Sequence, residues 1–249
     1  LLAQKGLRVL LLEKDRFPRF HIGESLMPET YGPFRRLGML DKLKGTVFPR
    51  KHSVQFISPR GRASAPFYFS ETNPHESSIT WQVLRSEFDQ ILRDNAAAKG
   101  ARVWLGASAQ EVLFEGERAV GVRAKLADGQ VEDLPAKVVV DASGQSALMA
   151  RKMKIKETEP ELKKASIFTH FEGALRDAGI DEGATLILHT DNKDSWFWYI
   201  PLPDDRVSVG VVGDLGYLLQ RRKKDTQEIF QEELEKCQPL VRRLERARP

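Results

Sequence analysis

The sequence predicts an α/β fold that carries a second, mostly antiparallel group of strands. The run from Val9 to Leu12 is apolar at every position, which is typical of a strand covered on both faces. Apolar residues at helical spacing follow Arg85 and precede Gly100, after which a strand begins near Arg102. A later set of short strands between 166 and 212 is broken by Pro and Asp turns. These patterns indicate an α/β part, in which helices and strands alternate, and a later group of mostly antiparallel strands.

Composition excludes several classes of protein. The chain has 249 residues, 41% hydrophobic and 30% charged, which are values of a folded globular protein. The net charge of +4 is spread along the chain and gives no nucleic-acid patch. No apolar run reaches the ~20 residues of a membrane span, and Leu1 to Glu13 has no signal-peptide pattern. A single cysteine, Cys237, excludes an internal disulfide and fits a reducing, cytoplasmic location. The five histidines lack metal-ligand spacing, so we predict no metal site.

The remaining elements follow from the same patterns. Short antiparallel strands are predicted at 102–105, 110–114, 119–126 and 131–134, and a buried strand at 138–140. The second group comprises 166–171, 185–189, 196–200 and 207–212. An amphipathic helix through Ile229 and Cys237 is followed by a break at Pro239 and a second helical stretch.

Two acidic residues stand where buried strands end. Glu13 ends the first strand, the position at which a nucleotide-binding α/β unit places its ribose ligand. The chain contains no usable G-x-G-x-x-G, so an ordinary acidic strand end explains Glu13 equally well. Asp141 ends the strand at 138–140 and leads into a small-residue turn that closes with Gly144. Such a turn lets a ligand or another backbone approach closely.

Three segments together resemble a known family. They are "FPRFHIGESLMP" at 17–28, "RSEFD" at 85–89 with "VVVDASG" some fifty residues on, and "WFWYIP" at 196–201. The first two resemble flavoproteins of the FAD-dependent monooxygenase superfamily. The third matches the W-x-W-x-I-P motif of its flavin-dependent, tryptophan halogenase-like members. The resemblance extends to about Gly216.

The resemblance implies a fold and a domain plan. It implies a Rossmann-like FAD-binding domain of the p-hydroxybenzoate hydroxylase type, interleaved with a mostly antiparallel substrate-domain sheet. Residues 1–45 and 80–150 would form the FAD-binding domain, 46–79 and 160–215 the substrate sheet, and 216–249 C-terminal helices. The glycine loop of such a domain and the G-D-A-x-x-x-D-P-like segment are both missing, so we expect a partial enzyme.

The resemblance also implies FAD-binding residues. Gly23, Glu24 and Ser25 would open a helix that runs toward Leu40 and lies against the flavin, although a plain helix cap explains them as well. Arg85 would contact the FAD phosphates, for which its guanidinium is suited; a surface ion pair is the alternative.

By the same resemblance, Glu13, Asp141 and Gly144 complete the expected cofactor-binding set. Asp141 would face the ribityl and pyrophosphate. A strand-ending turn explains Asp141 and Gly144 without any ligand.

Lys51 is the expected catalytic residue. Related halogenases have a strand that reads roughly K-x-G-x-x-F, and "KHSVQF" supplies Lys51 and Phe56, with Ser53 at the glycine position. A partly desolvated lysine has a lowered pKa, so it can offer a neutral amine to hypohalous acid or a donor that positions it. A solvated strand lysine is the alternative.

The W-x-W-x-I-P motif consists of Trp196, Trp198, Ile200 and Pro201. Alternation puts both tryptophans on one face of a strand and Phe197 and Tyr199 on the other. In the family, this motif keeps the organic substrate away from the flavin, where it would be hydroxylated. Paired tryptophans in an ordinary core are the alternative.

The resemblance therefore implies an FAD-dependent halogenase that uses reduced FAD, oxygen and halide. The implied substrate is an electron-rich aromatic or pyrrolic molecule, with a carrier-protein-tethered form among the options, and a separate flavin reductase would supply the reduced FAD. Two alternatives stay open: a geranylgeranyl-reductase-like or hydroxylating FAD-dependent enzyme, and a non-catalytic fragment.

Overall fold

A computed structural model describes all residues from 1 to 249, and the chain forms two compact units. The first comprises Leu1–Phe20 and Asp89–Pro160, and the second His21–Phe88 and Glu161–Pro249. These two units are defined by which residues pack together. The FAD-binding and substrate domains predicted from the sequence are defined by the ligands that they would bind, and they remain a prediction.

The first unit contains two small sheets. Strand β1 (Leu10–Glu13) pairs in parallel with β6 (Arg102–Leu105), which follows helix α4 (Arg85–Ala98). Strands β7 (Ser108–Glu115), β8 (Arg118–Lys125) and β9 (Val131–Pro135) form an antiparallel meander. The helix ends before Gly100, whose φ of +96° only glycine adopts readily, as predicted.

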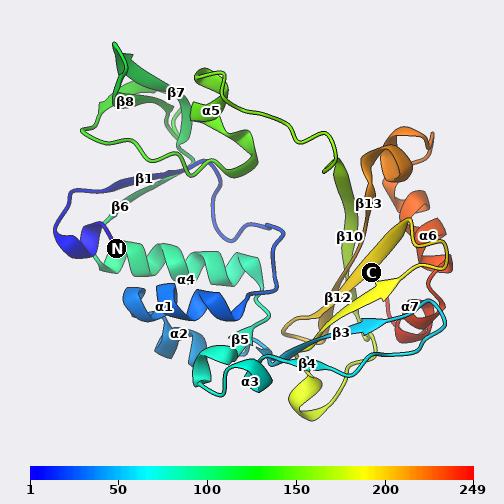
Figure 1. Cartoon of the computed structure of the whole chain (residues 1–249). Helices are drawn as coiled ribbons and strands as arrows, with labels where there is room; N and C mark the ends of the chain where they lie inside the picture. Colours follow the sequence, from blue (N-terminus) through cyan, green and yellow to red (C-terminus); the bar gives the residue numbers. More distant parts are fainter. The chain divides into compact units, whose positions relative to one another are not determined.

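The second unit is built on one six-stranded sheet in the order β10-β13-β12-β11-β3-β4 (Figure 1). The strand bounds are β3 Ser53–Ile57, β4 Phe67–Tyr68, β10 Lys164–Glu172, β11 Thr185–His189, β12 Ser195–Pro201 and β13 Arg206–Asp214. All neighbours are antiparallel except β11 and β3, which pair in parallel. The predicted second group of strands is therefore confirmed, and β3 and β4 extend it.

Two C-terminal helices cover one face of this sheet. Helices α6 (Thr226–Glu235) and α7 (Gln238–Arg243) lie along one side of it in Figure 1. Their apolar side chains pack against alternate strand residues, and the shared core includes Phe197, Tyr199, Val209, Val211, Ile229, Phe230 and Leu240. Because side chains alternate along a strand, this packing sends Trp196 and Trp198 to the opposite face. The alternation predicted for β12 is confirmed.

Shorter elements connect these parts. They are η1 Ala3–Lys5, η2 Pro28–Thr30, α1 Tyr31–Leu37, α2 Leu40–Lys44, β2 Arg50–Lys51, α3 Phe69–Thr72, η3 Glu76–Ser78, β5 Thr80–Trp81, η4 Gly144–Ser146, α5 Leu148–Lys152, η5 Gly179–Asp181 and the π-turn η6 Gly216–Gln220. Strands β2 and β5 form a two-stranded antiparallel pair.

Three sequence predictions about strands are wrong. The segment at 138–140 is not a strand, and Val138 and Val140 are 77% and 71% exposed, because no strand lies beside it. The strand at 102–105 pairs in parallel with β1, whereas the sequence predicted it as one of the short antiparallel strands between 102 and 134. Strand β1 belongs to a sheet of only two strands, so Leu10 and Leu11 are 38% and 37% exposed where a fully covered strand was expected.

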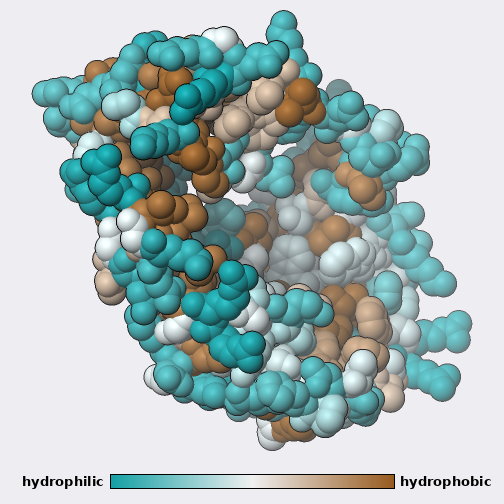
Figure 2. Space-filling view, turned by 60° about the vertical axis from the view of Figure 1, so that its left-hand side comes forward, coloured by the Kyte–Doolittle hydropathy of each residue, from teal (hydrophilic) through white to brown (hydrophobic).

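The visible surface in Figure 2 is mostly hydrophilic, with apolar residues in separate brown patches. None of the helices combines the length and apolar character that crossing a bilayer requires.

Candidate active site

Lys51 is a buried lysine in the second unit. Strand β2 places it opposite Thr80 of β5, and only 1% of Lys51 is exposed. Its Nζ donates a hydrogen bond to the carbonyl oxygen of Leu26 at 3.1 Å and lies 3.7 Å from Sδ of Met27. The ring centroid of Phe69 lies 5.4 Å from the same nitrogen. The amine therefore has one strong acceptor and otherwise soft, weakly polar neighbours.

This environment changes the acid–base chemistry of Lys51. Burial lowers the pKa of the Lys51 amine from 10.5 to about 8, because removing the ammonium from water disfavours the charged form. The carboxylate of Glu29, in η2, opposes the shift and raises the pKa. At pH 7, one unit below this pKa, about a tenth of Lys51 is thus an uncharged amine, the nucleophilic form.

The segment at 22–26 holds the carbonyl that binds Lys51. The sequence predicted that Gly23, Glu24 and Ser25 open a helix, but they run as an extended segment beside β5, and helix α1 begins only at Tyr31. The amide of Leu26 donates to the carbonyl of Trp81 at 3.1 Å, and the amide of Val83 donates to the carbonyl of Glu24 at 2.7 Å. The backbone groups of this segment are therefore hydrogen-bonded to residues 81–83 instead of to one another in a helix.

Glu24 is a buried carboxylate, 1% exposed. Its Oε1 lies 2.8 Å from Nε2 of His170 in β10, whereas its Oε2 is buried without a hydrogen-bond partner. A buried carboxylate oxygen without a donor is costly, and functional sites retain such groups more often than cores do. The pair anchors the segment at 22–26 to the large sheet.

Ser25 is anchored by a second buried network. Its Oγ lies 3.0 Å from Oγ1 of Thr185 in β11, and Nε2 of Gln82 donates to Thr185 at 2.9 Å and to the carbonyl of Gly183 at 2.8 Å. Gln82 is fully buried, and its Oε1 has no partner. The side chains of Thr185 in β11 and of Gln82, just after β5, thereby fix the backbone next to Lys51.

Gly23 and Arg85 form a tight contact in the same segment. Nη1 of Arg85 donates to the carbonyls of Ile22 at 2.5 Å and Gly23 at 3.2 Å. A Cβ on Gly23 would lie 2.9 Å from this nitrogen, and its φ of +102° also requires glycine. Arg85 thus holds the loop through these two bonds, and its contact with FAD phosphates remains a prediction.

The W-x-W-x-I-P motif is well packed on the face of β12 opposite the helices. The ring of Trp198 lies across Gly210 of β13, because a Cβ there would be 2.2 Å from the indole. Its Nε1 donates to Ser208 at 3.1 Å, and the ring of Phe168 lies 6.0 Å away, centroid to centroid. Trp196 is half-buried, and Ile200 and Pro201 are buried. The predicted role of the motif, to keep the organic substrate away from the flavin, remains a prediction.

The other expected cofactor residues lie in the first unit. Glu13 accepts from Arg19 at 3.2 Å and from the amide of Asp15 at 3.0 Å. The carboxylate of Asp141 accepts from the amides of Ser143 at 2.9 Å and Met149 at 2.8 Å. Hydrogen bonds from Ser143 and from the Met149 amide lower the pKa of Asp141.

These bonds shape the turn, and Gly144 within it has a φ of +59° with open space around it. The structure thus groups Gly23, Glu24, Ser25 and Arg85 with Lys51 in one unit, and Glu13, Asp141 and Gly144 in the other.

Several residues of this site escaped the sequence analysis. Met27, Phe69, Gln82 and His170 are brought to Lys51 and the segment at 22–26 by chain-distant pairing, which leaves no local pattern. The contact of Gly210 with Trp198 could have been predicted from the sequence. The two residues stand on either side of the predicted turn at Pro203 and Asp204, at positions that pair when the flanking strands form an antiparallel hairpin.

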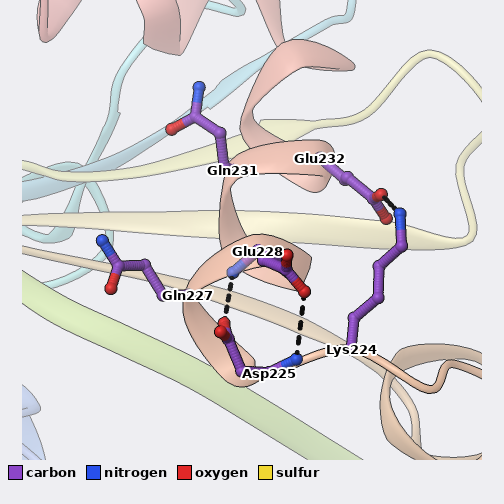
Figure 3. A pocket seen from close by; sticks show the side chains of 6 residues that line it. All are labelled: Lys224, Asp225, Gln227, Glu228, Gln231 and Glu232. Atoms are coloured by element: carbon purple, nitrogen blue, oxygen red, sulfur yellow. Dashed lines mark hydrogen bonds and ion pairs between the residues drawn. The ribbon is translucent and has the colours of Figure 1, made fainter.

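A surface hollow at the start of α6 has a different character. Figure 3 shows six side chains around it: Lys224, Asp225, Gln227, Glu228, Gln231 and Glu232. Asp225 and Glu228 exchange side-chain-to-backbone bonds as a capping box, and Lys224 pairs with Glu232. These contacts stabilise the helix start. No group of three or more His, Cys, Asp or Glu side chains is placed to bind a metal ion.

Comparison with known proteins places the chain in a family. A model of the tryptophan halogenase family matches residues 60–239. A 1H-pyrrole-2-carbonyl-[peptidyl-carrier protein] brominase of Pseudoalteromonas luteoviolacea is 34% identical over 244 residues, which cover 96% of this chain and 57% of that protein. The corresponding chlorinase of Pseudomonas fluorescens is 31% identical over 231 residues, covering 85% of this chain and 51% of that protein.

A solved structure agrees with the sequence relatives. The myxobacterial chondrochloren halogenase CndH, described as a variant of FAD-dependent halogenases, superposes with a TM-score of 0.90 at 32% identity, covering 99% of this chain and 56% of that one. The chain spans about half the length of the curated relatives it matches. Since the family model matches more than half of the chain, and the mixed α/β fold agrees, the chain belongs to the tryptophan halogenase family.

Proposed function

We propose that this chain is part of an FAD-dependent halogenase in which Lys51 delivers the halogen. The observation that carries the proposal is the buried amine of Lys51, which is held by the Leu26 carbonyl and whose pKa is lowered to about 8. A structural lysine at a strand edge would keep its ammonium in water. A lysine that is buried and has no salt bridge to offset the cost suits a chemical task.

The chemistry at Lys51 balances in two steps. The neutral amine attacks hypohalous acid, so that an N–halogen bond forms and water leaves. An electron-rich ring then attacks the halogen, a C–halogen bond forms, the amine is restored, and a ring proton is lost. The ammonium form has a second use, because it can donate a hydrogen bond to the oxygen of hypohalous acid and make the halogen more electrophilic.

FAD is the proposed cofactor, and when bound in reduced form it supplies hypohalous acid from oxygen and halide. The fit rests on the backbone of Gly23, which is exposed although the Arg85 guanidinium fills the space of its missing side chain, so a flat ring would approach this loop from its solvent side. The open turn at Asp141 and Gly144 suits a phosphate or ribityl chain. To bind a ribose hydroxyl, the Glu13 carboxylate would give up the hydrogen bond that it accepts from the Asp15 amide or from Arg19. Arg85 would hold the segment at 22–23 in place.

The proposed substrate is an electron-rich aromatic or pyrrolic ring. The brominase and chlorinase relatives act on a pyrrole held by a peptidyl carrier protein, so a carrier-tethered pyrrole is the first form to test. A separate flavin reductase is the proposed source of reduced FAD.

The test is bromination by the whole protein that contains this chain. Reduced FAD, oxygen and bromide are supplied with a phenol or a carrier-bound pyrrole, and brominated product is measured by mass spectrometry. Lys51→Gln should abolish the product, because an amide cannot carry the halogen, whereas Lys164→Gln, at an exposed position of β10, should leave it unchanged. Hydroxylated product from the wild type, or bromination that survives Lys51→Gln, would contradict the proposal.

A further inference from the structure

The thioether of Met27 is the reactive group that the site leaves without a role. Its Sδ lies 3.7 Å from Nζ of Lys51, and 49% of the residue is exposed. The sulfur thus contacts the buried amine, while about half of the residue that carries it is open to solvent. Any oxidant held at Lys51 is therefore within reach of Met27.

Hypohalous acid oxidises thioethers. The sulfur lone pair attacks the halogen, water supplies oxygen to the sulfur, and the sulfoxide, a halide ion and protons result, so sulfur loses the two electrons that the halogen gains. The reaction consumes the same reagent that the ring substrate would consume. When the ring is absent, the sulfur is the next nucleophile beside Lys51.

We propose that Met27 is a site of oxidative modification, converted to the sulfoxide by hypohalous acid held at Lys51. The proposal rests on the proposed function for the source of the oxidant. The sulfoxide oxygen is a hydrogen-bond acceptor, so oxidation gives the Lys51 amine a new polar partner and changes the site that delivers the halogen. Turnover without substrate should therefore inactivate the enzyme progressively.

The rest of the chain supplies internal controls. Met153, in the first unit, is 50% exposed, which matches Met27. It stands between Lys152 and Lys154 in the chain, but the Lys152 amine binds Glu111, and neither amine donates a hydrogen bond to the Met153 sulfur. Met39 is fully buried. Cys237 is also buried, and burial raises the pKa of its thiol to about 11, so it does not compete as a thiolate.

The experiment adds a limiting amount of reagent hypobromous acid to the purified protein and measures sulfoxide at each methionine by peptide mass spectrometry. Proximity to Lys51 should make the sulfoxide yield at Met27 about tenfold higher than at Met153. Hydrogen peroxide, which does not halogenate amines, should oxidise Met27 and Met153 equally. Equal yields with hypobromous acid, or the same preference with peroxide, would overturn the proposal.

A substitution separates the lysine from simple exposure. Lys51→Gln should bring the Met27 yield down to that of Met153, and Lys164→Gln should leave the tenfold ratio unchanged. A preference for Met27 that persists in folded Lys51→Gln protein would overturn the role of Lys51. Should that variant not fold, the wild-type ratio and the peroxide control still decide the question.

The reagent assay needs no flavin and no turnover, so it is independent of the proposed function. Brominated product with equal oxidation of Met27 and Met153 would reject this inference and leave the function intact. Selective oxidation of Met27 by the reagent, without any brominated product from the enzyme, would support the site and reject the enzyme as its source of oxidant.

Discussion

Glu24 and His170 are 146 positions apart in the chain, yet their Oε1 and Nε2 atoms lie 2.8 Å apart. This contact fastens the extended segment next to Lys51 to the six-stranded sheet. The backbone of the same segment pairs with β5, whose neighbour β2 carries Lys51. The geometry of the site thus depends on side chains that never approach a substrate.

Removal of this anchor should destabilise the second unit. Glu24→Ala removes the contact with His170 and opens a small cavity, so the free energy of unfolding should fall by about 1–3 kcal/mol. Urea unfolding measures the change. Glu71→Ala, at an exposed position of α3, is the control and should stay within about 0.5 kcal/mol of the wild type. Equal effects of the two substitutions would argue against an anchoring role.

The contact between Trp198 and Gly210 predicts that a larger side chain at position 210 destabilises the protein. Gly210→Ala would place a Cβ 2.2 Å from the indole, so it should lower the free energy of unfolding by about 1–3 kcal/mol. Gly32→Ala, in helix α1 with nothing within 4 Å of the new Cβ, should change it by no more than about 0.5 kcal/mol, because the entropy gain of alanine is offset by the following Pro33. Thermal unfolding of both variants checks the pair, and a neutral Gly210→Ala would disprove the packing of Trp198.

The lowered pKa of Lys51 should be visible in stability. The folded amine titrates at about 8 and the unfolded amine at 10.5, so the unfolded state binds more protons between these values, and the free energy of unfolding should rise with pH across that window. Lys51→Gln should lack this rise. Denaturant unfolding between pH 7 and pH 10 measures it, and a parallel pH dependence in both proteins would show that the Lys51 pKa is unshifted.

Glu29 should tune the same titration. Its carboxylate raises the pKa of Lys51, so Glu29→Gln should move that pKa below 8. Nuclear magnetic resonance of the Lys51 side chain during a pH titration gives the value directly. Glu71→Gln, an exposed change in α3, serves as the control and should leave the titration where it is. A rise after Glu29→Gln would contradict the assignment.

A buried charge cluster beneath α6 should govern acid stability. Glu233 is fully buried and accepts from Ser195 at 2.5 Å, Lys236 at 2.7 Å and Tyr217 at 2.9 Å, and it also pairs with Arg222. Burial alone would raise the pKa of Glu233, but the hydrogen bonds from Lys236, Ser195 and Arg222 lower it. The stability that this depressed pKa contributes is present above the unfolded value near 4.5 and is lost as pH falls through the folded value.

Glu233→Gln should therefore cost about 1–3 kcal/mol at neutral pH, since it takes the charged acceptor away from the partly buried cations of Arg222 and Lys236. The variant should also lose less stability than the wild type on acidification. Glu235→Gln, on the exposed side of the same helix, should change neither quantity. Urea unfolding at pH 7 and pH 4 tests both statements.

The sequence predicted the elements whose pattern is local. Alternation in the strand at 196–200 and helical spacing before Gly100 both gave correct elements, and Lys51 was singled out by its motif. The segment at 23–25 misled because glycine, glutamate and serine suit a helix start, whereas its backbone pairs with residues 81–83, far along the chain. His170 and Gln82 have no local pattern, since only the completed sheet brings them to the site.

The parallel pairing of β3 with β11 has a consequence for biosynthesis. The ribosome releases Val54 long before its partner Thr185, so the central sheet cannot close until the later strand has emerged. During that interval, Phe56 and Phe67, which are 49% and 56% exposed even in the finished fold, are unprotected on the nascent chain. Slow non-local closure of this kind favours aggregation, so heterologous expression should yield more native protein when translation is slowed or chaperones are abundant.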